Sequence, residues 1–61
     1  MTTIGQKIKT EREKAGWSRD GLAVRIGYSY GSVVLWETDA HKPHERAIRS
    51  LEKAFGIKLR K

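Results

Sequence analysis

A regular alternation of helix-ending and helix-starting residues most constrains the fold of this chain. Gly16, Gly27 and Gly56 each follow a segment whose apolar residues repeat at helical spacing, and glycine is the residue that most readily adopts the left-handed conformation just past a helix. Ser18 and Ser29 come two residues after the first two of these glycines. Serine is favoured at a helix N-cap because its hydroxyl accepts a hydrogen bond from a free backbone amide. The pattern therefore predicts short helices joined by tight turns.

The apolar spacing and the caps give approximate bounds for four helices. The sequence predicts helices over residues 4–15, 19–26, 30–38 and 44–55, followed by a basic tail at residues 58–61. Thr3 and Gln6 have the spacing of a capping box before the first of them. The third segment is rich in β-branched and aromatic residues, so a strand is the alternative there. No linker or internal repeat interrupts the chain, and residues 1–61 are expected to form one domain.

At 61 residues the chain is close to the lower size limit for a domain that folds without cross-links. It has no cysteine, which excludes disulfides and thiolate metal sites, and two histidines alone do not make a zinc site. Trp17 and Trp36 are expected to supply much of the core. No apolar run approaches the roughly 18 residues of a membrane span, and the first residues lack the layout of a signal peptide. These features suggest a cytoplasmic protein.

The charge of the chain is concentrated toward its C-terminal end. The formal net charge is +6. Residues 1–40 hold six basic and five acidic side chains, a net of +1, whereas residues 41–61 hold seven basic and two acidic ones, a net of +5. No charged residue occurs from Ile26 to Trp36. A basic balance of this size indicates a polyanionic partner such as nucleic acid, an anionic membrane or an acidic protein.

No pattern in the sequence indicates an enzyme. The serines are explained as caps or surface residues, and no motif links one of them to a histidine and an acid. No glycine-rich phosphate loop follows a predicted strand. We therefore expect no catalytic activity, cofactor, metal or small-molecule ligand.

An ordered set of short motifs runs through nearly the whole chain, from residue 4 to residue 57. The set comprises Ile4-Gly5-Gln6-Lys7-Ile8-Lys9 with Arg12, Ala15-Gly16-Trp17-Ser18-Arg19, Leu22-Ala23, Gly27-Tyr28-Ser29, Val33, Trp36-Glu37, Pro43, Ile48, Leu51, Ala54 and Phe55-Gly56-Ile57. In order and spacing these motifs resemble the Cro/repressor-type, or XRE-like, helix-turn-helix family. The resemblance implies a compact all-α domain of four to five helices with the lambda-repressor-like fold, in which the second and third helices form the DNA-reading unit.

The resemblance implies that the third predicted helix is the recognition helix and lies in the major groove of DNA. It places Tyr30, Gly31, Ser32 and Leu35 toward the base edges. Only Tyr30 and Ser32 among them carry hydrogen-bonding side chains, whereas the family more often has Gln, Ser, Thr, Arg or Asn there. Val34 and Leu35 stand where polar residues are usual. Apolar side chains at these positions can contact thymine methyl groups, or they can face a partner protein or a second copy of the chain.

Positions facing the DNA backbone follow from the same resemblance. They are Ser18, Arg19, Ser29, Thr38, Lys42, His44 and Arg46. Arg19 stands at the start of the second predicted helix, where backbone amides and the helix dipole also favour a phosphate; a solvated arginine is the alternative. For Lys42, His44 and Arg46 the alternative is a solvated basic loop.

The resemblance further implies an internal ion pair between Arg12 and Glu37, which ties the first helix to the end of the third. The alternative is two unrelated surface charges, which contribute little to stability. If the pair is internal, loss of Glu37 leaves Arg12 without a partner and lowers stability rather than DNA binding.

The resemblance implies a sequence-specific, double-stranded-DNA-binding transcriptional regulator, most often a repressor of phage, plasmid or bacterial type. Weak homodimerisation through Phe55, Ile57 and Leu59, or dimerisation only on DNA, is expected. A protein-interaction module such as an antitoxin or anti-repressor is the main alternative. Binding of structured RNA through the basic tail is a second one.

Overall fold

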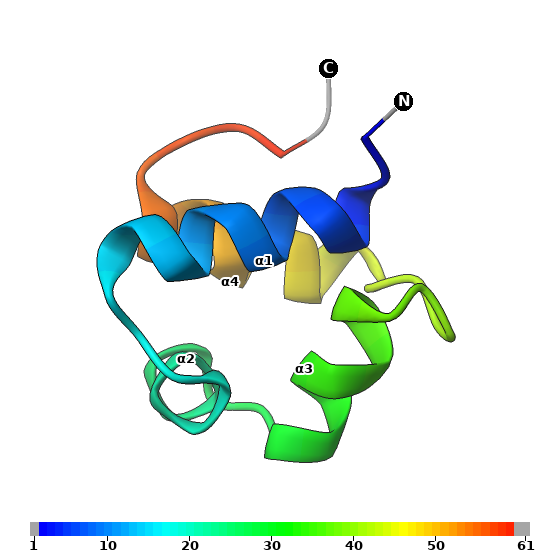
Figure 1. Cartoon of the computed structure of the whole chain (residues 1–61), viewed down its shortest axis with the longest axis horizontal. Helices are drawn as coiled ribbons and strands as arrows, with labels where there is room; N and C mark the ends of the chain where they lie inside the picture. The colour runs from blue at the N-terminus through cyan, green and yellow to red at the C-terminus, as the bar shows by residue number, and fades with distance from the viewer. Residues whose placement is uncertain (1, 60–61) are drawn as a thin grey trace.

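The computed structural model describes residues 2–59, and every regular element in that range is a helix. In chain order the helices are α1 (Ile4–Ala15), α2 (Arg19–Ile26), α3 (Tyr30–Glu37) and α4 (Glu45–Phe55). In Figure 1, α4 lies behind α1 across the upper part of the molecule, and α2 and α3 lie below them. The predicted all-α class is confirmed, and the third segment forms a helix rather than a strand. Of the predicted basic tail, residues 60–61 lie outside the described range.

Each helix begins where the sequence offers a side chain to its free amides. Thr3 Oγ1 accepts from the Gln6 amide at 3.1 Å, and Gln6 Oε1 accepts from the Thr3 amide at 3.0 Å, which completes the capping box of α1. Ser18 and Ser29 cap α2 and α3, with their hydroxyl oxygens 2.9 Å and 3.2 Å from helix amides. The glycines that end α1, α2 and α4 have φ values of 71° to 76°, in the left-handed region. Local capping therefore fixes most of the helix ends.

Two helix ends differ by one residue from the sequence prediction. α3 ends at Glu37 rather than at Thr38, because Thr38 is the C-cap and its hydroxyl donates to the carbonyl of Val34 at 2.9 Å. α4 begins at Glu45 rather than at His44, because His44 is the N-cap and its Nδ1 accepts from a backbone amide of the first turn at 3.3 Å. Both capping side chains thus have a polar atom committed to a helix end.

The core lies between the four helices and takes apolar side chains from all of them. The buried set is Ile8 from α1, Leu22, Ala23 and Ile26 from α2, Val33 and Trp36 from α3, and Ala47 and Leu51 from α4. Trp17, expected in the core, packs against the edge of this cluster and is only partly buried. It lies in the turn between α1 and α2 rather than on the buried face of a helix.

α1 approaches the end of α3 very closely at Gly5. Gly5 is buried, and a Cβ at this position would overlap the carbonyl oxygen of Trp36 and the carboxylate of Asp39. Asp39 has a left-handed backbone, with φ of 63°, and its Oδ2 accepts from Thr3 Oγ1 at 2.8 Å. The start of α1 is therefore held against the end of α3 by the close contact of Gly5 with the Trp36 carbonyl and by the hydrogen bond from Thr3 to Asp39.

A buried carboxylate joins three of the helices. Glu37, the last residue of α3, has a fully buried side chain. Arg12 of α1 donates from Nε to Glu37 Oε2 at 2.7 Å and from Nη2 to Oε1 at 3.3 Å. Arg19, at the start of α2, donates from Nε to Glu37 Oε1 at 3.1 Å. Arg12 Nη1 also donates to the carbonyl of Trp17 at 2.8 Å, in the turn between α1 and α2.

The two arginines replace the hydration that Glu37 loses on burial. Charge-assisted hydrogen bonds from guanidinium groups are the strongest substitutes for water around a carboxylate. No buried side-chain nitrogen or oxygen in residues 2–59 lacks a hydrogen-bond partner. Glu37, and after it Tyr30, raises the pKa of Arg19 above its usual value. Because that pKa is raised, the contribution of Arg19 to stability is lost only in strong alkali.

Gly5→Ala is expected to lower the free energy of unfolding by about 2–3 kcal/mol, although alanine is the better helix former, because α1 has to move away from α3. Urea unfolding followed by circular dichroism measures the change. Thr10→Ala, at an exposed position of α1, is the control and should change stability by less than about 0.5 kcal/mol. Equal stability of the two variants would contradict the close contact.

Glu37→Ala is expected to lower the free energy of unfolding by about 3–5 kcal/mol, because the Arg12 guanidinium is left buried without its carboxylate. Glu37→Gln should lose less, since its amide oxygen still accepts a hydrogen bond. Glu13→Ala, which removes an exposed carboxylate of α1, is the matched control for the change of charge. A melting temperature of Glu37→Ala equal to that of the parent would overturn this role of Glu37.

Candidate nucleic-acid interface

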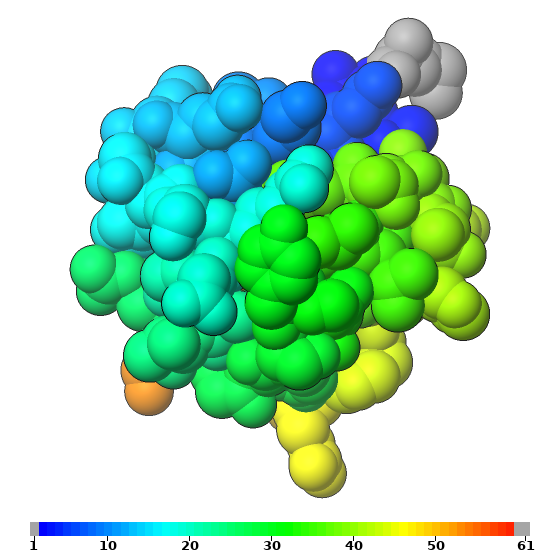
Figure 2. All heavy atoms as spheres, turned by 60° about the horizontal axis from the view of Figure 1, so that its bottom comes forward, coloured from blue at the N-terminus to red at the C-terminus, as the bar shows by residue number. Residues whose placement is uncertain are grey.

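α3 presents a largely uncharged surface to solvent beside α2. Tyr30 is 52% exposed and Leu35 is 41% exposed; Gly31 is exposed and Ser32 is partly exposed. Figure 2 shows this face, with the green atoms of α3 between the cyan atoms of α2 and the yellow-green segment that leads to α4. The four residues predicted to face bases are thus at the surface of the domain. Their contact with bases stays a prediction.

The apolar positions of this face differ from one another in exposure. Val34 is partly buried, so Leu35 is the better placed of the two to contact a ligand. Val24 on α2 is 75% exposed, and sequence reasoning did not single it out. Its position outside the apolar spacing of α2 is the signal that marks it as a surface residue. Val24 on α2 and Leu35 on α3 are thus the exposed apolar side chains that these two helices offer a partner.

Hydroxyl groups stand at the starts of α2 and α3. Ser18 and Ser29 accept from helix amides through their oxygen lone pairs, so the hydroxyl hydrogen of Ser18 can still be donated. The hydroxyls of Ser29 and Ser32 are 3.0 Å apart, and one of them donates to the other. At the far end of α3, the Thr38 hydroxyl uses its single hydrogen on the Val34 carbonyl. Thr38 therefore donates to a phosphate only if its side chain turns away from α3.

Arg19 stands at the first position of α2 and is held there by Glu37. Its side chain is 32% exposed. A guanidinium has five N–H donors, so the bond from Nε to Glu37 leaves others for the exposed side. Sequence reasoning missed the bond to Glu37, because the family resemblance paired Glu37 with Arg12 alone and no local pattern relates residues 18 positions apart. The interpretation of Arg19 as a phosphate contact alone is therefore incomplete, because this residue is also part of the buried network.

The segment after α3 carries the other predicted phosphate contacts. Lys42, His44 and Arg46 are all exposed. The His44 ring is held by its capping bond and lies 5.9 Å from the ring of Tyr28, which meets Trp36 edge-on at 5.2 Å. Neither Lys42 nor Arg46 forms an ion pair within residues 2–59. Their charges are thus open to a partner.

The residues predicted as dimer contacts pack partly against their own chain. Phe55 stacks on Trp17, with ring centroids 5.8 Å apart. Leu59 packs against the core, and its amide donates to Glu52 Oε2 at 2.9 Å. Ile57 is partly buried. These contacts use part of the apolar surface that a dimer would need, and homodimerisation stays a prediction.

Metal-binding clusters and membrane-spanning helices are both absent from the described part of the chain. Within residues 2–59 no group of three or more His, Cys, Asp or Glu side chains is placed to hold a metal ion. In the same range no helix has the length and apolar character that crossing a bilayer requires. What the face of α2 and α3 offers a ligand is hydroxyl groups, apolar side chains and nearby cations.

Comparison with known proteins places this geometry in a family. Residues 3–60 match the family described as the helix-turn-helix domain. Multiprotein-bridging factor 1 of Schizosaccharomyces pombe (strain 972 / ATCC 24843) is 31% identical over 58 residues, which make up 95% of this chain. The chain spans 39% of the length of that relative.

Solved structures share the fold at lower sequence identity. The P22 c2 repressor, solved in complex with synthetic operator 9T in the presence of Tl+, has a TM-score of 0.91 at 22% identity, over 97% of this chain and 89% of that one. A chain of the SinR protein/SinI protein complex has a TM-score of 0.87 at 22% identity, over 93% of this chain and 56% of that one. The solved structures confirm the predicted lambda-repressor-like fold, and the family match shows that the chain belongs to the helix-turn-helix domain family.

Proposed function

We propose that this chain binds double-stranded DNA through α2 and α3 and regulates transcription in a sequence-specific manner, most simply as a repressor. The observation that carries the proposal is the exposed, uncharged part of α3, with cations on the elements to either side of it. The residues concerned are Tyr30, Gly31, Ser32 and Leu35 on α3, and Arg19, Lys42 and Arg46 beside it. The P22 c2 protein, which shares this fold, is a repressor in complex with an operator, and this supports the same function here.

The cations suit the phosphates of a duplex, and the uncharged side chains of α3 suit its base edges. Cations displace counterions from phosphates and fix the position of the protein, but they carry no sequence information. The amides at the starts of α2 and α3, capped by Ser18 and Ser29, suit phosphate oxygens as well. The exposed part of α3, which carries no charge, can then approach base edges in the major groove without being drawn to the phosphates.

Sequence preference would come from few groups. The Tyr30 and Ser32 hydroxyls can exchange hydrogen bonds with base edges, and Leu35 can contact thymine methyl groups. Arg19 does not compete with these groups for base edges, because its hydrogen bond to Glu37 holds the side chain at the start of α2. We therefore expect a preference for sites rich in A·T pairs at the positions under Leu35.

Gly31 supports a close approach of α3 to its ligand, because the fold does not require a glycine there. The other glycines have structural reasons: a left-handed backbone at Gly16, Gly27 and Gly56, and a close neighbour at Gly5 and Gly21. A Cβ at Gly31 would find no heavy atom nearer than 3.9 Å. Glycine inside a helix costs about 1 kcal/mol relative to alanine. The missing side chain is best explained by contact with something outside the domain.

A protein-interaction module is the second candidate, and the exposure of Val24 and Leu35 favours it. One structural relative is a chain from a complex of two proteins, SinR and SinI, so a protein with this fold can have a protein partner. In that case the apolar face of α2 and α3 would meet the partner, and selection from random duplexes would recover no common site. A recovered palindrome supports the regulator instead.

Binding to duplex DNA is expected to weaken steeply with salt, with a slope of log association constant against log salt of about −4 to −5 per domain for four to six phosphate contacts. Fluorescence anisotropy with a selected duplex measures the slope. Lys42→Gln and Arg46→Gln should each reduce its size by about 1. Lys9→Gln, at an exposed cation of α1, is the matched control and should leave it unchanged. A slope near zero would overturn the proposal.

Gly31→Ala is expected to move stability and DNA affinity in opposite directions. The variant should gain up to about 1 kcal/mol of stability from helix propensity. Its affinity for the selected duplex should fall by about tenfold, or about 1.4 kcal/mol, because the methyl group holds α3 away from the bases. Thr10→Ala is the control for added helix propensity, with no loss of affinity expected. If Gly31→Ala bound DNA as well as the parent, the close approach would be excluded.

A further inference from the structure

We propose that the groove that α4 forms with the end of α1, Trp17 and the end of α2 is a docking site for an acidic segment of another protein that inserts a large apolar side chain. This groove is formed by residues outside the proposed DNA-binding face. The inference therefore goes beyond the proposed function and can be tested without DNA.

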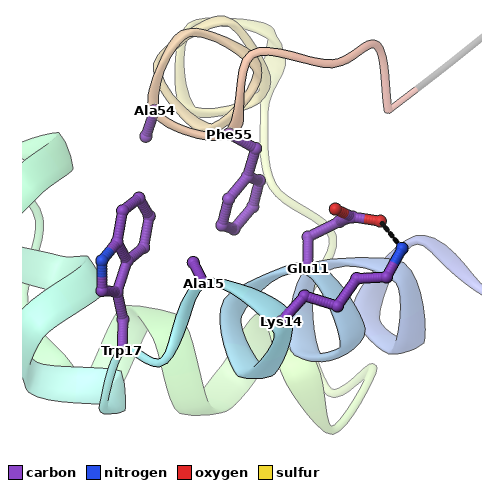
Figure 3. Close-up of a pocket in the computed structure, with 6 residues that line it drawn as sticks. All are labelled: Glu11, Lys14, Ala15, Trp17, Ala54 and Phe55. Atoms are coloured by element: carbon purple, nitrogen blue, oxygen red, sulfur yellow. Dashed lines mark hydrogen bonds and ion pairs between the residues drawn. The ribbon is translucent and has the colours of Figure 1, made fainter.

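The groove is defined by two cavities that both border Ala54 of α4, one toward α1 and Trp17 and the other toward α2. The first has a volume of about 300 Å³ and is lined by Glu11, Lys14, Ala15, Trp17, Ala54 and Phe55. The second has a volume of about 340 Å³ and is lined by Arg25, Ile26, Ser50, Lys53 and Ala54. Figure 3 shows the first cavity, with Trp17 and Phe55 on facing elements and the short side chains of Ala15 and Ala54 beside them. Because the side chains of Ala15 and Ala54 are short, an open space remains beside the Trp17 and Phe55 rings.

The size of the groove suits side chains of a peptide better than a cofactor. Sites for small molecules commonly have volumes of about 300–1,000 Å³, so each cavity is at the lower limit. The Trp17 and Phe55 rings are nearly parallel, with an interplanar angle of 18°. An apolar side chain placed against the edges of this pair and against Ala54 would bury area that is now partly exposed, which favours binding.

The charges around the groove select the partner. Lys14, Arg25 and Lys53 are exposed cations, and Glu11 is the single acid among the lining residues. The Glu11 carboxylate is already paired with Lys7 at 3.6 Å and with Lys14 at 3.5 Å. Since Lys14 and Glu11 offset each other, Arg25 and Lys53 make the rim positive, which attracts an acidic partner and repels a second copy of a chain with a net charge of +6.

A peptide fits these observations better than a nucleic acid. Proteins that bind single strands present free aromatic faces on which bases stack. Here the Arg25 guanidinium lies 4.3 Å from the centroid of the Trp17 ring, and Phe55 stacks on the same ring. The faces of the Trp17 ring are therefore already in use, which leaves the ring edges and Ala54 for an apolar side chain. None of the residues predicted to face bases or phosphates lines either cavity, so a duplex and an acidic segment can be bound together.

The test is a selection of random peptides displayed on phage against the folded chain. We expect enrichment of segments in which acidic residues flank one large apolar residue. The best synthetic peptide should shift backbone amide resonances of Trp17, Arg25, Ala54 and Phe55, but not those of α3. Ala54→Leu, which fills the groove, should weaken the peptide at least about tenfold, as should Lys53→Glu. Lys9→Glu is the control of equal charge and should leave peptide affinity unchanged.

Three outcomes would overturn the proposal: no enriched peptide, enrichment of basic or uncharged peptides, or full binding of the acidic peptide to Ala54→Leu. Circular dichroism of each variant checks that it keeps its helical content, so that a loss of affinity cannot be due to unfolding. A dimer found by ultracentrifugation, with resonance shifts in the groove, would assign the groove to a second copy instead. The affinity of Ala54→Leu for the selected duplex should equal that of the parent. The experiment therefore distinguishes an error in the proposed peptide site from an error in the proposed DNA-binding function.

Discussion

The buried carboxylate of Glu37 is the interaction on which the arrangement of the helices depends. It receives hydrogen bonds from Arg12 of α1 and Arg19 of α2 while it belongs to the end of α3. A buried charge is tolerated only when it is fully paired, so the three helices must meet in one geometry for the domain to be stable. In a chain of 61 residues with few buried side chains, this condition limits the fold as strongly as the apolar core does.

The network also separates the two ends of α3. Its C-terminal end is held by Glu37 and by the close contact of Gly5 with the Trp36 carbonyl. Its N-terminal half carries the exposed Tyr30 and Gly31 and is free of such contacts with α1. Because its C-terminal end is held in place, α3 keeps its orientation and can present the same exposed side chains to each ligand. Rigid support of this kind is what a binding surface needs for specificity.

Positive charge is used on two different surfaces. On the proposed DNA-binding face it stands beside the uncharged, exposed part of α3, which suits a duplex whose bases and phosphates are separate. Around the groove near Trp17 it surrounds apolar rings, which suits an acidic peptide with an apolar residue. Composition alone indicated only a polyanionic partner. Because Arg25 and Lys53 line a cavity that no residue of α3 lines, we expect two partners, a duplex at α3 and an acidic peptide at the groove.

The four helices, most of their caps and most of the apolar core could be predicted from the amino-acid sequence, because helix ends and apolar spacing are local properties that each segment carries with it. The family resemblance added the fold and the pairing of Arg12 with Glu37. Three features came from packing alone: Arg19 also bonds to Glu37, Trp17 lies at the edge of the core, and Ala54 and Phe55 border a groove. Those features depend on how helices distant in sequence pack together, and no local pattern contains that information.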